Sequence, residues 1–305
     1  MNPVAAPLTV HSLICHKHVD MALVCLSSFY RCSDRPVDLR LHDDGSITPE
    51  DAARLKAAFP TARLVMRKES DQLAAERLRA LPKCLEFRGV TEMAFKLFDP
   101  LLMNREPFLL LDTDILFFNA FENLCDESAG GAVLTYMEDI RYSYSMMPLE
   151  SLWHKELRPV RRLNAGMLFV RSGQIDLGYI EYVLKKFPHL GPMGGVTEQT
   201  LWGILATRLG ARKWNPRQVS IVTPAFQPGA DQVAAHFVTP ARHRLGEFTN
   251  GTAYGSPGRR VRVPTEEATP YLPHHSVTAL RDYLSIRLQN RLYLLRTAFR
   301  GAEKA

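Results

Sequence analysis

The amino-acid sequence predicts an α/β protein, with a mostly parallel central sheet flanked by helices and an amphipathic helix near the C-terminus. Short apolar runs alternate with helical patterns through the first half of the chain, which is typical of β-α-β units. One of these runs, Phe108–Leu111, contains no polar residue, as expected of a central strand covered on both faces. The chain has 305 residues, of which 46% are apolar and 23% charged, so it can bury one sizeable core.

The spacing of apolar residues places the individual elements. Strands are expected at Leu8–Cys15, Val37–Leu41, Ala62–Met66, Phe108–Leu111, Ala132–Tyr136, Gly166–Val170 and Val233–Val238. Helices are expected at His18–Tyr30, Pro49–Phe59, Val90–Met103, Leu177–Phe187, Thr197–Leu209 and Val277–Phe299. The second helix has the clearest start, because Thr48 and Asp51 form the pattern of a capping box around Pro49. Residues 246–275 are rich in Gly, Pro and Thr and are expected to form loops.

Charge and cysteine content limit the classes of partner and compartment. The net charge of +6 favours an anionic partner: a nucleotide diphosphate, a nucleic acid or an acidic membrane surface. Because Lys and Arg are scattered rather than gathered into one stripe with aromatic residues, we expect no nucleic-acid binding. The five cysteines show no metal-ligand spacing, as in cytosolic proteins with reduced thiols. The sequence also lacks the patterns of a signal peptide and of a transmembrane helix, so a cytoplasmic protein is expected.

Two aspartates directly follow the apolar strand Phe108–Leu111. Asp112 and Asp114 are separated by one residue, and the apolar run Ile115–Phe118 comes next. Ligands of open α/β sheets bind at the carboxyl ends of the strands, where a carboxylate pair can hold Mn²⁺ or Mg²⁺ on the phosphates of a nucleotide. The alternative is that both aspartates merely cap a turn. Their place after a buried strand favours the metal.

The segment Leu109–Phe118 resembles the Asp-x-Asp (DxD) segment of GT-A glycosyltransferases that use nucleotide sugars, especially the retaining glycogenin and bacterial galactosyltransferase-like families. Further segments resemble these families in the same order: the Asn-Ala-Gly strand Asn164–Val170, the Glu-Gln dipeptide that opens Glu198–Trp202, and His236 on a late strand. The resemblance spans about Leu8 to Arg244. It implies a GT-A (Rossmann-like) fold and a nucleotide-sugar-binding catalytic domain over residues 1–245, with a loop and a basic amphipathic helix over 246–305 packed on it.

The sequence also departs from these families. Their usual ending, His-x-x-Gly-x-x-Lys-Pro-Trp, is absent from His236–Arg244. In addition, Leu41–Ser46 resembles the Asp-Asp-Gly-Ser turn of inverting GT-A enzymes, in which an aspartate contacts the nucleoside. Both a retaining and an inverting outcome therefore remain open.

On the donor side, each candidate residue has a functional and a structural interpretation. Asp43 and Asp44 are expected to hold the nucleoside, or to form an Asx turn with Gly45 at positive φ. Lys96 lies on the helix before the metal strand, where it faces the donor in the resembling families or is a solvated lysine. Arg242 and Arg244 are expected to clamp the diphosphate, or to form a basic surface loop.

On the sugar and acceptor side, Asn164 is expected to present its amide to a sugar hydroxyl, or else to satisfy backbone groups. Glu198 and Gln199 are expected to line the sugar and acceptor, with Glu198 as the base of an inverting enzyme; the alternative is an acid favoured by the helix dipole. The resemblance makes His236 the third metal ligand beside Asp112 and Asp114, whereas a lone histidine next to Phe237 is otherwise usually a core residue.

The C-terminal helix has an apolar stripe with arginines nearby. The stripe consists of Val277, Leu280, Leu284, Leu288, Leu292 and Leu295. Such a helix packs on the catalytic domain or lies on an anionic membrane through residues 277–300. In the second case the protein is peripheral to the inner face of a membrane.

The function expected from these features is transfer of a hexose from a nucleotide-diphosphate sugar to a glycan, lipid or protein acceptor. A UDP-sugar is favoured over a GDP-sugar as the donor, and Mn²⁺ or Mg²⁺ is expected at the DxD motif. A nucleotidyltransferase of similar topology is the enzymatic alternative. It requires a Gly-rich loop after the first strand, whereas Cys15–His18 has no glycine. A non-enzymatic scaffold or membrane-peripheral module using the basic helix is the other alternative. The sequence does not indicate an oligomeric state.

Overall fold

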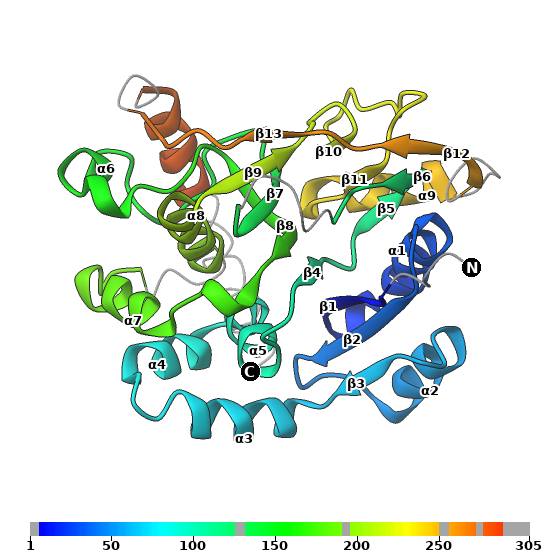
Figure 1. The fold of residues 1–305 in the computed structure, drawn as a ribbon, viewed down its shortest axis with the longest axis horizontal. Coiled ribbons are helices and arrows are strands. Elements are labelled where there is room, and N and C mark those ends of the chain that lie inside the picture. The colour runs from blue at the N-terminus through cyan, green and yellow to red at the C-terminus, as the bar shows by residue number, and fades with distance from the viewer. Residues whose placement is uncertain (1–5, 126–131, 191–195, 250–255, 273–276, 289–305) are drawn as a thin grey trace, which may run out of the picture.

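The computed structural model describes residues 6–125, 132–190, 196–249, 256–272 and 277–288. Its centre is an eight-stranded sheet with the strand order β13-β9-β7-β8-β4-β1-β2-β3 (Figure 1). Six of these strands run in one direction, while β8 and β13 run antiparallel to their neighbours. The expectation of a mostly parallel central sheet flanked by helices is therefore confirmed.

The strands of the large sheet are β1 (Leu8–Ile14), β2 (Val37–Asp43), β3 (Arg63–Val65), β4 (Phe108–Leu111), β7 (Leu134–Glu138), β8 (Leu163–Val170), β9 (Ala211–Trp214) and β13 (Thr265–Glu267). A small sheet combines β10 (Val219–Ile221), β11 (Ala234–His236) and β5 (Ile115–Phe117), and β12 (Ser256–Arg262) pairs with β6 (Asn119–Glu122). The helices are α1 (Val19–Cys32), α2 (Pro49–Ala58), α3 (Arg67–Arg77), α4 (Pro82–Val90), α5 (Phe95–Met103), α6 (Glu150–Trp153), α7 (Leu177–Lys186), α8 (Thr197–Leu209) and α9 (Leu245–Thr249).

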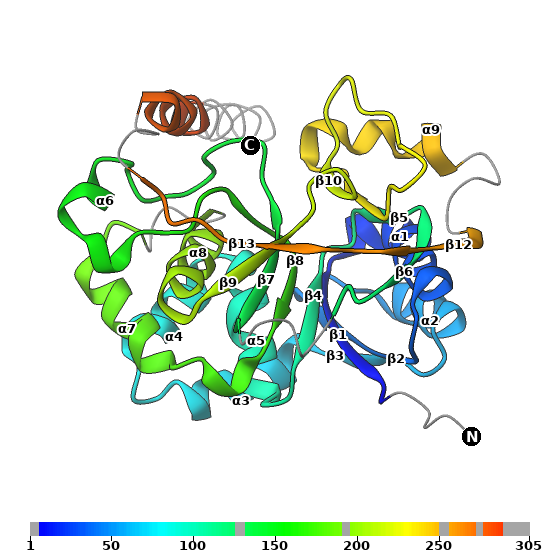
Figure 2. The same ribbon diagram turned by 45° about the horizontal axis from the view of Figure 1, so that its top comes forward.

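The two faces of the sheet carry separate hydrophobic cores, and β4 contributes to both. Phe108 and Leu110 belong to the core formed with α3, α4, α5, α7 and α8, whereas Leu109 and Leu111 belong to the core formed with α1 and α2. Figure 2 shows these two sets of helices on either side of the sheet. All four side chains are buried, because side chains alternate across a strand and both faces of β4 are covered.

Most of the expected elements are present, with shifted ends. The capping box of α2 is confirmed, since the Thr48 side chain accepts from the Asp51 amide and the Asp51 side chain accepts from the Thr48 amide. The sequence patterns did not identify α3, α4 or the short strands β5, β6, β9 and β10. The loops expected over residues 246–275 contain two strands, β12 and β13, and β13 is an edge strand of the large sheet.

The C-terminal helix is present over residues 277–288, and the remainder of the expected Val277–Phe299 helix lies outside the described residues. Its buried face carries Ala279, Tyr283 and Ile286, not the predicted leucine stripe. Of that stripe, Val277, Leu284 and Leu288 are exposed. No helix within the described part of the chain is both long enough and apolar enough to cross a bilayer.

Candidate active site and metal centre

Two strand ends bring three potential metal ligands together. Asp112 and Asp114 follow β4, and His236 ends β11, which pairs antiparallel with β5 so that His236 lies opposite Ile115. Ligand atoms of Asp112, Asp114 and His236 all lie within 4.8 Å of one another. The His236 Nε2 atom is 2.9 Å from Asp114 Oδ1 and 3.8 Å from Asp112 Oδ2. The interpretation of the two aspartates as turn caps does not account for this convergence with a histidine from a distant strand.

The Asn-Ala-Gly segment of β8 orients His236. The backbone N–H of Gly166 donates to Asn164 Oδ1 at 2.9 Å, which identifies that atom as the amide oxygen. The Nδ1 atom of His236 lies 3.0 Å from the same oxygen, so Nδ1–H is the donor and Nε2 is directed at Asp114. A Cβ atom on Gly166 would lie 2.3 Å from Cε1 of His236. Only glycine leaves room for the histidine ring here.

Two basic side chains hold the carboxylates. The Lys96 Nζ atom lies 2.7 Å from Asp112 Oδ1 and 2.9 Å from Oδ2. Arg242 donates from Nε and Nη2 to Asp114 Oδ2 at 2.9 and 2.8 Å, and its Nη1 atom lies 3.0 Å from His18 Nε2. Lys96 is buried, so its interpretation as a solvated helix lysine is wrong.

Arg244 has a different position. It donates to both Glu247, at 2.8 Å, and the Thr223 carbonyl, at 2.7 Å. These bonds tie the segment after β11 to the segment after β10, and Arg244 faces a neighbouring cavity. Arg242 and Arg244 therefore do not act as two arms of one clamp in this structure.

The mutual arrangement of charges shifts several pKa values. Burial raises the pKa of Asp114, but the neighbouring His236 and Arg242 outweigh burial and hold it well below its usual range. Burial lowers the pKa of His236, yet Asp114 and then Asp112 raise it above its ordinary value. Likewise Asp112 overcomes the effect of burial and raises the pKa of Lys96. Asp114 is thus ionised and matched by the guanidinium group of Arg242, and an aspartate must be ionised to bind a metal ion.

Glu198 and Gln199 stand on α8 beside this cluster and differ in their contacts. Gln199 is committed to the fold, since Oε1 accepts from the Ala165 amide at 3.0 Å and Nε2 donates to the Ser143 carbonyl at 2.7 Å. Glu198 is buried, and its Oε1 atom has no hydrogen-bond partner among the described residues. Burial raises the pKa of Glu198 most, Lys96 opposes it and Asp112 adds to it, which gives a value of about 7.

Asp43 and Asp44 form a tight turn at the carboxyl end of β2. Asp43 Oδ1 accepts from the amides of Gly45 at 2.7 Å and Ile47 at 3.2 Å, and Asp44 Oδ1 accepts from the Ser46 amide at 2.9 Å. Gly45 has φ of +102°, a conformation that L-residues rarely adopt. The Asx-turn interpretation is therefore correct. The turn also borders a cavity of about 740 Å³ together with Ile47, Met66 and Arg67.

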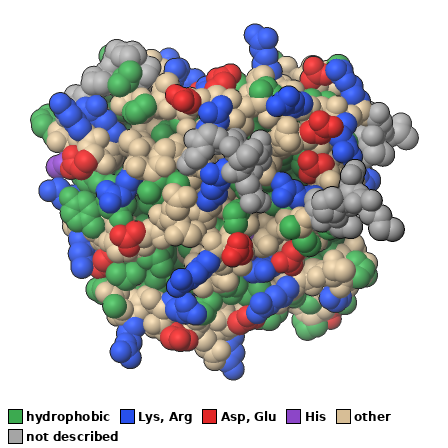
Figure 3. Space-filling model, viewed as in Figure 1, with side chains coloured by type: hydrophobic (Ala, Val, Ile, Leu, Met, Phe, Trp, Pro, Cys, Tyr) green, Lys and Arg blue, Asp and Glu red, His purple; other side chains and the backbone are tan. Residues whose placement is uncertain are grey.

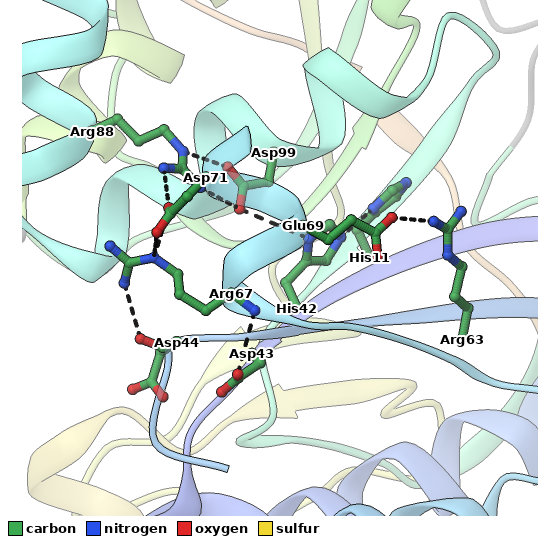
Figure 4. A network of polar contacts seen from close by, with 10 residues as sticks. All are labelled: His11, His42, Asp43, Asp44, Arg63, Arg67, Glu69, Asp71, Arg88 and Asp99. Carbon is green, nitrogen blue, oxygen red and sulfur yellow. Dashed lines mark hydrogen bonds and ion pairs between the residues drawn. The ribbon is translucent and has the colours of Figure 1, made fainter. Parts of the chain in front are cut away.

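An ionic network, buried at Arg88 and Asp99 and partly exposed at Arg67 and Asp71, supports this turn (Figure 4). Arg67 donates to the Asp44 carbonyl at 3.0 Å and to Asp71 at 2.7 Å. Arg88 joins Asp71 to the buried Asp99, at 2.7 Å on each side. Arg67 is therefore held at the wall of the cavity by a chain of alternating charges rather than by one surface pair.

Sequence reasoning missed several residues that complete the site. His18 contacts Arg242, and Asp139 accepts from Asn164 Nδ2 at 3.1 Å. Arg67 forms a wall of the cavity beside Asp43. His18, Arg67 and Asp139 each follow a strand, β1, β3 and β7 respectively, so the rule that ligands bind at carboxyl ends of strands was the signal that could have found them.

Comparison with solved structures identifies the fold. The apo form of mouse xyloside xylosyltransferase 1 is similar with a TM-score of 0.54 and 11% identity, over 78% of this chain and 99% of that chain. The galactosyltransferase LgtC, solved with donor and acceptor sugar analogues, is similar with a TM-score of 0.52 and 14% identity, over 80% of this chain and 95% of that chain. No protein-family model and no curated protein matches the chain. The protein has the GT-A fold, as the motif order predicts.

Proposed function

We propose that this protein transfers a sugar from a nucleotide-diphosphate sugar to an acceptor hydroxyl, with a divalent metal ion at the DxD motif. The observation that carries the proposal is the convergence of Asp112, Asp114 and His236 at the carboxyl end of β4, within a GT-A fold. Carboxyl ends of strands are where open α/β sheets bind ligands.

The three side chains fit a divalent ion. Two carboxylates and a neutral imidazole suit Mn²⁺, and the carboxylates alone also suit Mg²⁺. The Nδ1 atom of His236 is occupied by its hydrogen bond to Asn164, so Nε2 is the ring atom that faces Asp114. When bound, the ion would act as a Lewis acid on the charge of the departing diphosphate.

The donor would lie along the carboxyl edge of the sheet. The cavity beside Asp43 and Arg67 takes the nucleoside, and strands β2, β1 and β4 are consecutive neighbours. The carboxyl ends of β2 and β4 are therefore two strand spacings, or about 10 Å, apart, and a nucleoside diphosphate is long enough to bridge them. Lys96 and Arg242, already directed at the aspartates, supply the positive charge around the diphosphate. We favour a UDP-sugar over a GDP-sugar and a hexose as the transferred sugar.

Asn164 and Glu198 would face the sugar and the acceptor, and Gln199 holds the strand that carries Asn164. A carboxyl group whose pKa is about 7 is suited to take a proton at neutral pH, so Glu198 is the base if the enzyme inverts the anomeric centre. A retaining enzyme needs no protein base, since the leaving diphosphate can take the acceptor proton.

The test is ligand-induced thermal stabilisation with Mn²⁺ and a panel of UDP- and GDP-sugars. A ligand at a hundredfold excess over its Kd stabilises the folded state by about 2.7 kcal/mol, which is readily measured. We expect stabilisation by a nucleotide sugar only with metal, and its loss in Asp112→Asn and in Asp114→Asn. The surface variant Asp231→Asn is the matched control. Absence of stabilisation by every nucleotide sugar in the presence of metal would refute the proposal.

A further inference from the structure

A second cavity, of about 820 Å³, adjoins the metal centre on the side away from the nucleoside cavity. Gln199 and Asp139 both line it, and Asp139 reaches His236 through Asn164. In the large sheet β4 lies between β2, which ends at the nucleoside cavity, and β7, which ends next to Asp139. Cavities of this size, next to reactive groups, typically bind small molecules.

One segment serves both the metal centre and this cavity. Residues 239–244 form a 3-10 helix after β11. Within it Arg242 is directed at Asp114, while Pro240, Ala241 and His243 face the cavity. A molecule in the cavity is therefore separated from the proposed metal by a single turn of backbone.

The walls of the cavity are mainly apolar. Its apolar side chains include Ile140, Ile221, Val222, Val238, Pro240 and Ile286. Among its charged residues Arg244 is paired with Glu247 at 2.8 Å. Polar side chains such as Asp139, Ser143 and Thr239 can meet sugar hydroxyl groups, but the larger apolar part of the walls offers them no matching contacts. An apolar group of an acceptor fits them better.

An exposed apolar ridge lies on the helix that contributes Ile286 to this cavity. Ile286, on the helix of residues 277–288, lines the cavity, and Ile140 lines it while remaining 52% exposed. On the other face of the same helix Val277, Leu284 and Leu288 are 83%, 56% and 60% exposed. The positions 277, 284 and 288 recur at helical spacing and so lie on one side. Exposed apolar residues that gather in this way mark an interaction surface.

Positive charge accompanies the ridge. The side chain of Arg281 is 80% exposed on the same helix and lies 3.7 Å from the largely buried Asp282, and Arg141 follows Ile140 at the cavity. Apolar residues that can enter the acyl region, flanked by arginines that attract lipid phosphates, are the composition of a helix lying at an anionic bilayer. In Figure 2 this helix stands at one edge of the molecule, across from α9.

We infer that the acceptor is an amphiphile presented at an anionic lipid bilayer: its apolar part occupies this cavity, and Val277, Leu284 and Leu288 rest on the bilayer. The inference rests on the proposed function and names the acceptor class of that site. In the reaction the bond between the anomeric carbon and the diphosphate oxygen breaks, and a bond from that carbon to the acceptor oxygen forms. The acceptor proton passes to the base or to the departing diphosphate, so no oxidant or further reactant is needed.

The cavity is tested with two probes, n-octyl β-D-glucoside below its micellar concentration and methyl β-D-glucoside, by isothermal titration calorimetry with Mn²⁺ and UDP present. Because buried methylene groups favour binding, we expect the octyl compound to bind at least about tenfold more tightly. Ile140→Asp should remove that preference, whereas Leu85→Asp, a partly exposed leucine of α4, should keep it. Equal binding of both glucosides, or an unchanged preference in Ile140→Asp, overturns the assignment of the cavity.

The ridge is tested by co-sedimentation with vesicles of phosphatidylcholine and of phosphatidylcholine mixed with phosphatidylglycerol. We expect binding only to the anionic vesicles, loss of that binding in the double variant Leu284→Glu/Leu288→Glu, and no loss in the matched pair Leu85→Glu/Val90→Glu. No binding, or equal binding by the double variant, overturns the membrane assignment. Stabilisation by Mn²⁺ and nucleotide sugar is measured on the same variants. If this stabilisation persists while vesicle binding is absent, the membrane inference is wrong and the proposed function still stands. If the stabilisation is absent as well, the proposed function itself fails.

Discussion

The two ends of the proposed donor site are built in different ways. In the turn at Asp43–Gly45 the aspartate side chains accept from amides at most four residues away, those of Gly45, Ser46 and Ile47, and Arg67 adds a bond to the Asp44 carbonyl. The proposed metal centre instead joins Asp114 to His236 and Arg242, which are more than 120 residues away in sequence. The turn depends mainly on local bonds and on the conformation of one glycine, whereas the cluster at Asp114 depends on the packing of β4, β8 and β11. Substitutions should therefore have larger effects at the metal centre than at the turn.

The largest effect is expected from Asp114→Asn. Removing this buried charge leaves His236 and Arg242 without their partner, and breaking a buried ion pair typically costs 3–5 kcal/mol. Because Arg242 is partly exposed, we expect a loss of about 3 kcal/mol in the free energy of unfolding. Urea denaturation measures it, with Asp231→Asn as the control. A loss no larger than in the control would contradict the ion-pair account.

A comparable effect of opposite sign is expected from Glu198→Gln at neutral pH without metal. Burial is the main cause of the raised pKa, from 4.5 to about 7. Between these values the folded protein binds a proton that the unfolded chain releases, so stability falls as pH rises through this window. This difference of about 2.5 pKa units corresponds to about 3 kcal/mol. Glutamine does not titrate, so we expect Glu198→Gln not to lose stability over this pH range. The difference in the free energy of unfolding between Glu198→Gln and the unsubstituted protein should therefore grow in favour of the variant from pH 4.5 to 7.5. A pH-independent difference would show that Glu198 is not titrating there.

A smaller loss, of about 2 kcal/mol, is expected from Gly166→Ala, because overpacking a core site costs about 1–3 kcal/mol. The added Cβ atom would lie within 3.0 Å of both His236 and Asn164, so the histidine must move. Metal-dependent stabilisation should also be lost. Gly89→Ala on α4 is the control, since its Cβ meets nothing within 4 Å and alanine favours a helix. Retained metal dependence in Gly166→Ala would contradict the proposed orientation of His236.

The smallest effect is expected at the turn. Gly45→Ala places the new Cβ 3.6 Å from Arg67, an ordinary contact, so only the positive φ is penalised. Forcing an L-residue into left-handed backbone costs about 1 kcal/mol. Thermal unfolding measures the loss, and nucleoside binding should weaken without change in Mn²⁺ binding. If both fell together, the turn and the metal centre would not be independent.

The parts of the fold that the sequence predicts are those with local causes. The strand Phe108–Leu111 and the capping box at Thr48 were placed correctly because their signals lie within a few residues. The helix α3 was missed because its buried residues, Ser70 and Ala74, leave it without an apolar stripe. The strands β12 and β13 were missed because they exist through pairing with β6 and β9, and pairing between distant segments has no local signature.

In the candidate site too, residues with a local sequence signal could be predicted, and residues placed by distant contacts could not. Asp112 and Asp114 could be recognised from the strand before them, and the order of later motifs brought in Asn164 and His236. Whether Lys96 was buried could not be read from the sequence, because its neighbour Asp112 comes from another element. Lys and Arg are interspersed with Asp and Glu on the face in Figure 3, so no single basic stripe singles out Arg242. The outward direction of Leu284 and Leu288 likewise depends on which face of the helix the domain covers.

The central claim is tested most directly by counting bound Mn²⁺ from the loss of its free-ion signal in electron paramagnetic resonance, with UDP-glucose present. We predict one tightly bound ion per chain in the unsubstituted protein and in Asp231→Asn, and none in Asp114→Asn or His236→Ala. Bound Mn²⁺ that persists at the same affinity in both Asp114→Asn and His236→Ala would contradict the assignment of the metal centre.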